Sequence, residues 1–177
     1  MLSFHHITDL NVKLAGEIKL LYERSFPLRE RRTWEELVRL LEEPAMSLKA
    51  IANEQQFIGL VVYWQFEEWL YLEHFAIVPE LRGQQFGRKV IECLLQESFG
   101  KLILETEPSE SQDSVRRIAF YEKCGLNIIP YPYQQPPYRR EELSFPMLLI
   151  SSTQLNQNQY ELIAALIKER VYDRFSD

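Results

Sequence analysis

The stretch 79–89, between a β-rich segment and a helical one, combines residues suited to binding an anion. Gly83 and Gly87 stand beside Arg82, Arg88 and Lys89. The first turn of a helix at such a junction presents backbone N–H groups without intrahelical partners and the positive end of the helix dipole. Glycine lets a ligand approach the backbone closely. The segment therefore predicts a phosphate-binding turn.

A second segment, Arg-Arg-Ile-Ala-Phe-Tyr-Glu-Lys-Cys-Gly-Leu at 116–126, completes a pattern with the first. Together they resemble the GNAT superfamily of acyl-coenzyme A-dependent N-acyltransferases. That family holds the coenzyme pyrophosphate in a turn of pattern R/Q-x-x-G-x-G/A, which Arg82 and Gly87 match while Gln85 replaces the first glycine. A later family helix ends in A-x-x-Y-x-x-x-G-F or a close variant. It is matched at Ala119, Phe120, Tyr121 and Gly125, with Leu126 in place of phenylalanine.

The resemblance implies acetyl-CoA as co-substrate, bound by the turn and by the strand before it. The backbone of that strand would hold the pantetheine arm. Ser114 stands where relatives often place an asparagine near the coenzyme. The residues implied in coenzyme binding are Phe75, Ala76, Ile77, Arg82, Gly83, Gln84, Gln85, Phe86, Gly87, Arg88, Ser114 and Tyr121.

Two side chains are candidates for catalysis, each with a structural alternative. The resemblance places the Tyr121 hydroxyl next to the coenzyme sulfur, where it would protonate the leaving thiolate; the alternative is a core tyrosine. Glu73 is a candidate general base acting through water, or a buried glutamate paired with an arginine. We interpret His74 as a hydrogen-bonded core or surface histidine. A covalent mechanism on Cys124 is disfavoured, because a helix C-terminus raises a thiol pKa.

The acceptor side is implied by the resemblance to lie near Ser25–Arg32 and the loop 130–142. The substrate-binding candidates there are Phe26, Arg29, Tyr133 and Tyr138. The loop 130–138 has four prolines and three tyrosines, which suits a rigid ligand-binding wall, although a simple spacer would look the same. Arginines near these segments favour an anionic acceptor and glutamates a cationic one. The charge of the acceptor, a small-molecule or peptide amine, is therefore not predicted.

Two functions follow from these residues. The first is direct transfer of an acetyl group from acetyl-CoA to a primary amine in a ternary complex. The alternative is a catalytically weak or inactive coenzyme A-binding sensor or interaction module, motivated by Gln85 in the place of a motif glycine.

Hydrophobic periodicity and turn residues predict the elements that position these side chains. We expect a mixed α/β fold with a mostly antiparallel sheet and helices on both faces. The predicted helices are 9–25 (capped by Thr8 and Asp9), 33–42, 85–99, 111–123 and 159–175, and the predicted strands are 47–52, 56–64, 69–78, 101–106, 126–131 and 143–150.

The domain organisation expected is one acyltransferase domain at 1–152 followed by an amphipathic helix within 153–177. Its apolar stripe comprises Tyr160, Ile163, Ile167, Val171 and Phe175. Such a stripe packs on its own domain or on a partner subunit, so a homodimer is one option.

Composition limits the remaining classes. The chain has 177 residues, a net charge of −6 and two cysteines, which disfavours nucleic-acid binding and a disulfide framework. The N-terminus lacks a signal-peptide pattern, and the longest clearly apolar stretch, 58–64, is too short for a membrane helix. His5 and His6 have no partners at metal-ligand spacing. We therefore expect a soluble cytoplasmic protein without metal.

Overall fold

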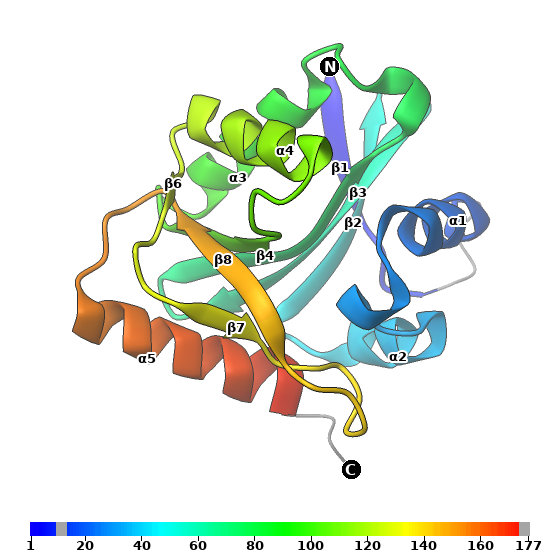
Figure 1. Cartoon of the computed structure of the whole chain (residues 1–177). Coiled ribbons are helices and arrows are strands. Elements are labelled where there is room, and N and C mark those ends of the chain that lie inside the picture. The colour runs from blue at the N-terminus through cyan, green and yellow to red at the C-terminus, as the bar shows by residue number, and fades with distance from the viewer. Residues whose placement is uncertain (10–13, 174–177) are drawn as a thin grey trace. The chain divides into compact units, whose positions relative to one another are not determined.

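The structure, a computed structural model, describes residues 1–9 and 14–173. Eight strands pair with one another in it, and helices flank them (Figure 1). The strands are β1 (Leu2–His6), β2 (Met46–Asn53), β3 (Gln56–Phe66), β4 (Trp69–Ile77), β5 (Leu102–Thr106), β6 (Asn127–Ile128), β7 (Tyr133–Gln135) and β8 (Phe145–Ser151). The α-helices are α1 (Ala15–Ser25), α2 (Trp34–Arg39), α3 (Phe86–Glu97), α4 (Gln112–Lys123) and α5 (Gln157–Ile167).

The pairing order is β1-β2-β3-β4-β5-β8-β6, with β7 also on β8. The pairings β1·β2, β2·β3, β5·β8, β6·β8 and β7·β8 are antiparallel. The predicted α/β class with a mostly antiparallel sheet is confirmed. The chain divides into two compact units, unit 1 (Met1–Gln65 and Leu72–Val90) and unit 2 (Phe66–Tyr71 and Ile91–Asp177).

Unit 1 is built on an antiparallel meander. A short turn joins β2 to β3 as predicted, and Glu54 adopts a positive φ angle of 58° there. The edge strand β1, which pairs Leu2 with Asn53 of β2, was not predicted. The reason is that Leu-Ser-Phe-His-His is short and lacks a clear period of two, so only its pairing identifies it.

The helices of unit 1 differ in how their starts agree with the sequence. The prediction that the first helix begins after Thr8 and Asp9 is wrong: α1 begins at Ala15, with no side-chain cap from its N-cap residue, Leu14. Ile18 and Tyr22 are buried, as the apolar spacing predicted, and Leu10 lies outside the described residues. The 3₁₀ turn η1 (Leu28–Glu30) links α1 to α2.

The start of α2 agrees with the predicted helix 33–42, and the structure adds its cap. Thr33 and Glu36 form a capping box, in which each side chain accepts a hydrogen bond from the other residue's backbone N–H. The helix continues into the 3₁₀ turn η2 (Leu40–Glu42), so the two together span the predicted helix 33–42.

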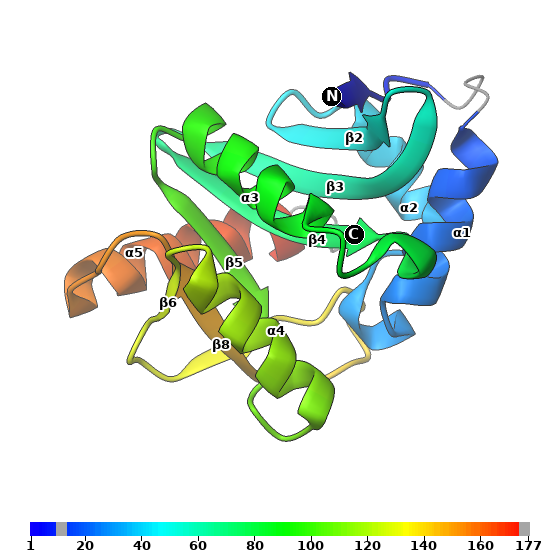
Figure 2. The same ribbon diagram turned by 90° about the horizontal axis from the view of Figure 1, so that it is seen from above.

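Unit 2 combines β5, β6, β7 and β8 with α4 and α5, which lie on opposite faces of these strands in Figures 1 and 2. The predicted strand 126–131 is shortened to β6, and β7 forms inside the predicted loop 130–138. Both strands obtain their partners from β8, a long-range pairing that local prolines concealed.

The predicted C-terminal helix is present as α5, followed by the π-helical turn η4 (Lys168–Tyr172). Ile163, Ile167 and Val171 of the expected stripe are buried, and Tyr160 is partly exposed. Phe175 lies outside the described residues. Among the helices of residues 1–9 and 14–173, none has the length and apolar character needed to cross a membrane.

Candidate functional site

The predicted phosphate-binding turn of unit 1 connects β4 to α3. After the 3₁₀ turn η3 (Pro79–Leu81), the Arg82 side chain folds back and its Nε donates to the carbonyl oxygen of Ile77 at 3.1 Å. Gly83 follows with φ +80°, and no atom lies within 4 Å of where a Cβ would be. Residues 82–85, 88 and 89 are exposed. The turn therefore presents open backbone and basic side chains to solvent at the start of a twelve-residue helix.

Gln85 is the residue at which the chain departs from the family turn. It occupies the position of the motif's first glycine and has φ +63°, in the left-handed region. A non-glycine residue there costs about 1–2 kcal/mol. The backbone thus keeps the conformation that favours glycine even though the side chain differs. The Gln85 residue is exposed.

One face of β4 is partly exposed where coenzyme binding was predicted. Burial alternates along the strand: Glu73, Phe75 and Ile77 are partly exposed, whereas His74 and Ala76 are buried. This agrees with the two faces expected from strand geometry. The Glu73 side chain is 0% exposed, so the accessible surface of this residue belongs to its main chain.

Gly59 on β3, which was not among the predicted residues, lies against the β4 segment of the candidate site. A Cβ built on it would lie 2.3 Å from the carbonyl oxygen of Ala76, far closer than atoms can approach. Only glycine leaves this carbonyl in place, so Gly59 supports the conformation of β4 at Ala76. A lone glycine inside an apolar strand was the available signal.

Glu73 itself lies in a buried ion pair. One of its carboxylate oxygens, Oε1, is 3.3 Å from Arg32 Nε, and the other, Oε2, accepts a hydrogen bond from Trp64 Nε1 at 2.6 Å. The Arg32 side chain is 4% exposed, and its guanidinium carbon lies 6.0 Å from the Trp64 ring centre. Of the two interpretations left open, this geometry favours a structural glutamate paired with an arginine.

His74 is a core histidine. Its Nε2 is 3.1 Å from the carbonyl oxygen of Glu30, and its ring makes edge contacts with Phe26 and Tyr22 at centroid distances of 4.5 and 5.0 Å. Burial lowers the His74 pKa, so the neutral ring is favoured. Phe26 therefore packs on the core, whereas the Arg29 side chain is largely exposed and pairs with Glu30 at 3.3 Å.

In unit 2, Tyr121 lies on α4 and is 7% exposed. Burial raises the pKa of its phenol to about 12, so the hydroxyl stays protonated through the neutral range. Within residues 1–9 and 14–173, no side-chain hydrogen bond is made by this hydroxyl. A protonated, uncommitted phenol is able to donate to an incoming group.

Ser114, the other coenzyme candidate of unit 2, has a local role. It is the third residue of α4 and forms a capping box with Ser111, whose side-chain oxygen accepts from the Ser114 backbone N–H at 3.0 Å. Its own hydroxyl accepts from the Ser111 N–H at 3.0 Å. The buried side chain is thus occupied in starting the helix.

Tyr133 and Tyr138 each contact a residue that was not predicted to belong to a site. The Tyr133 hydroxyl donates to Oε1 of Glu105, and the Tyr172 hydroxyl donates to Oε2 at 2.8 Å. The Tyr138 ring lies 4.9 Å from that of Tyr172, and the Tyr71 hydroxyl is 3.2 Å from the Tyr172 hydroxyl. Tyr172 was missed because it lies next to, not on, the predicted apolar stripe.

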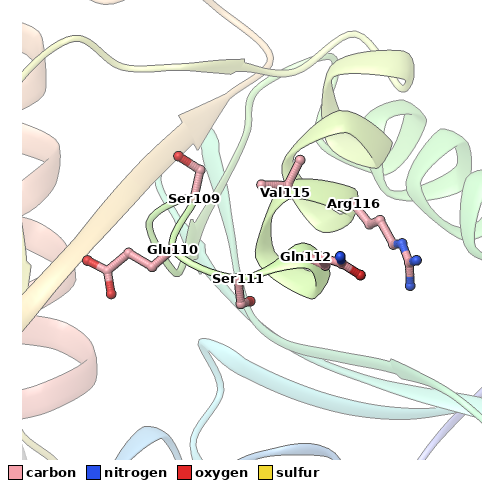
Figure 3. Close-up of a pocket in the computed structure, with 6 residues that line it drawn as sticks. All are labelled: Ser109, Glu110, Ser111, Gln112, Val115 and Arg116. Carbon is pink, nitrogen blue, oxygen red and sulfur yellow. The ribbon is translucent and has the colours of Figure 1, made fainter.

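A surface hollow of about 490 Å³ lies at the start of α4 (Figure 3). It is lined by Ser109, Glu110, Ser111, Gln112, Val115 and Arg116. None of the predicted site residues lines it. The described part of the chain contains no cluster of histidine, cysteine or acidic residues arranged to hold a metal, and Cys93 and Cys124 form no disulfide within it.

The sequence and the fold are similar to those of known proteins. The model of the Acetyltransferase (GNAT) family matches residues 15–126. A structure from Bacteroides thetaiotaomicron, described as an acetyltransferase of the GNAT family, has 31% identity and a TM-score of 0.87, covering 96% of this chain and 98% of that one. No curated protein matches the sequence.

More distant structures share the fold alone. A GNAT-family acetyltransferase from Elizabethkingia anophelis with acetyl-CoA bound has 15% identity and a TM-score of 0.56, covering 87% of this chain and 98% of that one. A spermidine N-acetyltransferase chimera from Vibrio cholerae and hSSAT has 16% identity and a TM-score of 0.61, covering 90% and 98%.

Proposed function

Because the chain belongs to the GNAT family of acetyltransferases, we propose that it transfers the acetyl group of acetyl-CoA to a primary amine by direct attack in a ternary complex. The observation that carries this proposal is the turn between β4 and α3, where Gly83 and Gln85 have φ of +80° and +63° beside exposed basic residues. That backbone is suited to a pyrophosphate at a helix N-terminus.

Of the residues proposed to bind the coenzyme, some belong to unit 1 and others to unit 2. In unit 1, the N–H groups of the turn 82–88 bind the pyrophosphate, with Arg82 and Arg88 adding positive charge. The main chain of Phe75, Ala76 and Ile77 binds the pantetheine arm through hydrogen bonds, which the exposure of alternate β4 residues supports. In unit 2, Ser114 contributes to coenzyme binding as part of the first turn of α4. Its hydroxyl does not take part, because it already accepts a hydrogen bond from the Ser111 N–H.

The chemistry needs three groups. The lone pair of the neutral amine attacks the thioester carbonyl carbon, backbone N–H groups of β4 stabilise the oxyanion, and the C–S bond breaks as the amide forms. Tyr121 donates its phenolic proton to the leaving thiolate and regains one from solvent. The proton lost by the amine passes to water, because the Glu73 carboxylate is held by Arg32 and Trp64.

The family comparisons leave the acceptor open, since one similar structure is named for spermidine and another as an IAA acetyltransferase from Bacillus cereus. Phe26 packs against the buried His74, so we assign it a structural role in unit 1 rather than contact with the acceptor. Exposed Arg29 in unit 1, and Tyr133 and Tyr138 in unit 2, remain the candidates for acceptor binding.

The deciding experiment compares the wild-type protein with Tyr121→Phe. Thiol release from acetyl-CoA is followed over a panel of primary amines, and coenzyme binding is measured by calorimetry. We expect Tyr121→Phe to lower turnover about a hundredfold or more, the usual contribution of a general acid, with coenzyme affinity unchanged. Tyr131→Phe, which changes a partly exposed tyrosine of the same unit, is the matched control.

Each outcome separates the two hypotheses. Coenzyme binding without acetylation of any amine in the panel would support the sensor module instead of the enzyme. Absence of coenzyme binding at millimolar concentration would remove both. Unchanged turnover in Tyr121→Phe would remove this phenol from the mechanism while leaving the acetyltransferase intact.

A further inference from the structure

Four tyrosines of unit 2 gather at the carboxylate of Glu105. Tyr133 and Tyr172 each donate a hydrogen bond to a different oxygen of this carboxylate, the second at 2.8 Å. Tyr71 reaches the Tyr172 hydroxyl at 3.2 Å, and the ring of Tyr138 packs on that of Tyr172 at 4.9 Å. We call these five residues the tyrosine cage.

The cage combines negative charge with aromatic surface. Burial and the charge of Glu105 raise the pKa of Tyr133 and of Tyr172 well above the ordinary value, so both phenols remain neutral donors. A carboxylate surrounded by aromatic rings attracts a cation through its charge and through the negative faces of the rings. An alkylammonium group has both the charge and the apolar carbons that such surroundings favour.

Two residues of the cage are partly exposed to solvent. Glu105 and Tyr138 are partly exposed, whereas Tyr71, Tyr133 and Tyr172 are buried. A ligand can therefore contact Glu105 and Tyr138 without unfolding the buried members.

A second observation at the same face points to a ligand. In the antiparallel pairings with β8, Glu105 lies opposite Leu149, Tyr133 opposite Met147, and Gln135 opposite Phe145. These β8 positions alternate by two, so Gln135 shares a sheet face with Tyr133 and Glu105. Gln135 is 2% exposed, and its amide nitrogen has no hydrogen-bond partner among the described residues. Such a buried donor is expected where a ligand oxygen completes it.

The cage depends on the C-terminal part of the chain. Tyr133, Tyr138 and Tyr172 all follow residue 126, where the match to the family model ends. The segment α5–η4 brings Tyr172 to Glu105. This gives the C-terminal helix a use beyond completing the core.

Resting on the proposed acetyl transfer, we infer that the tyrosine cage binds a positively charged alkylammonium group of the acceptor. The acceptors of this protein are then cationic amines that also carry a hydrogen-bonding oxygen, rather than anionic ones. Glu105 supplies the charge and the tyrosine rings supply the apolar walls, while the Gln135 amide, four positions away along β8, meets an oxygen at the far end of the acceptor.

The test uses choline, which has no N–H to acetylate, and 3,3-dimethylbutan-1-ol, its neutral analogue of the same shape. Binding to the full chain is measured by calorimetry at low salt without coenzyme. We expect choline to bind at least tenfold more tightly than the neutral alcohol, and Glu105→Gln to remove that preference. Glu161→Gln, on the exposed face of α5, should change nothing. Equal binding of the two probes to wild type would overturn the inference.

A second pair of variants covers the case in which Glu105→Gln does not fold. Tyr138 is partly exposed, so Tyr138→Phe and Tyr138→Leu should both fold. The aromatic replacement should keep choline affinity within about twofold, and the aliphatic one should weaken it about fivefold. A purely structural tyrosine cluster would instead show lower Tm values with choline affinity unaffected, which contradicts the inference.

The two proposals fail separately. Choline binding that depends on Glu105, without acetylation of any amine, would support the cage and contradict the enzyme. Acetylation of amines with a KM that is the same in Glu105→Gln, and no choline binding, would support the enzyme and contradict the cage.

Discussion

At the scale of single residues, the buried pair Arg32–Glu73 separates a structural from a catalytic glutamate. Both side chains are almost fully buried, and each carboxylate oxygen of Glu73 has a partner on Arg32 or Trp64. A base must exchange protons with substrate or water, which such enclosure opposes. The pair instead places opposite charges in a core where either one alone would be costly.

We predict that Glu73→Gln lowers the free energy of unfolding by about 3–5 kcal/mol, because the Arg32 charge is left buried without its counter-ion. Urea unfolding measures this, with exposed Glu35→Gln as control. The double variant Arg32→Met, Glu73→Gln should lose less than the single one. A single variant of wild-type stability whose activity loses its acidic pH limb would restore Glu73 as the general base.

At the scale of elements, β3 and β4 contact each other closely at one glycine. The Ala76 carbonyl occupies the space that a Gly59 side chain would need. Here a residue of one strand determines the backbone of the next, and β4 is the strand proposed to bind the pantetheine arm.

We predict that Gly59→Ala destabilises the protein by about 1–3 kcal/mol, the usual cost of overpacking, and weakens coenzyme A binding because β4 must shift. Gly16→Ala is the matched control: no atom lies within 4 Å of its Cβ position, and alanine favours the helix α1. Denaturant unfolding and calorimetry measure the two effects. Wild-type stability and affinity in Gly59→Ala would show that β4 tolerates the displacement.

At the scale of the whole molecule, the buried His74 couples folding to pH. Burial lowers its pKa in the folded chain, whereas the unfolded chain protonates near the ordinary value of about 6.5. The folded state then binds fewer protons, so its contribution to stability is complete above pH 6.5 and is lost as pH falls below it.

We predict that the free energy of unfolding falls by up to about 1.4 kcal/mol per pH unit on acidification from pH 6.5 to the folded-state pKa. His74→Gln, which keeps a donor for the Glu30 carbonyl, should reduce this slope. Chemical unfolding at a series of pH values between 5 and 7.5 measures it. An identical slope in both proteins would mean that other groups carry the pH dependence.

Much of the fold could be predicted locally, because its signals lie within a few residues. The strands of the central meander and the helices predicted at 33–42 and 111–123 follow from hydrophobic period and from the turn residues that flank them. The elements that were missed or changed, β1, β6 and β7, are short strands whose existence depends on a distant partner.

The candidate site divides in the same way. The sequence alone was enough to recognise the family and to predict a phosphate-binding turn and a candidate role for Tyr121, since the glycines, basic residues and Tyr-x-x-x-Gly spacing lie in two short stretches. The three-dimensional structure was needed to show that Glu73 is enclosed by Arg32 and Trp64, and that Tyr172 donates a hydrogen bond to Glu105, 67 residues away in the chain. Burial and side-chain pairing are sums over distant segments, and no local pattern encodes them.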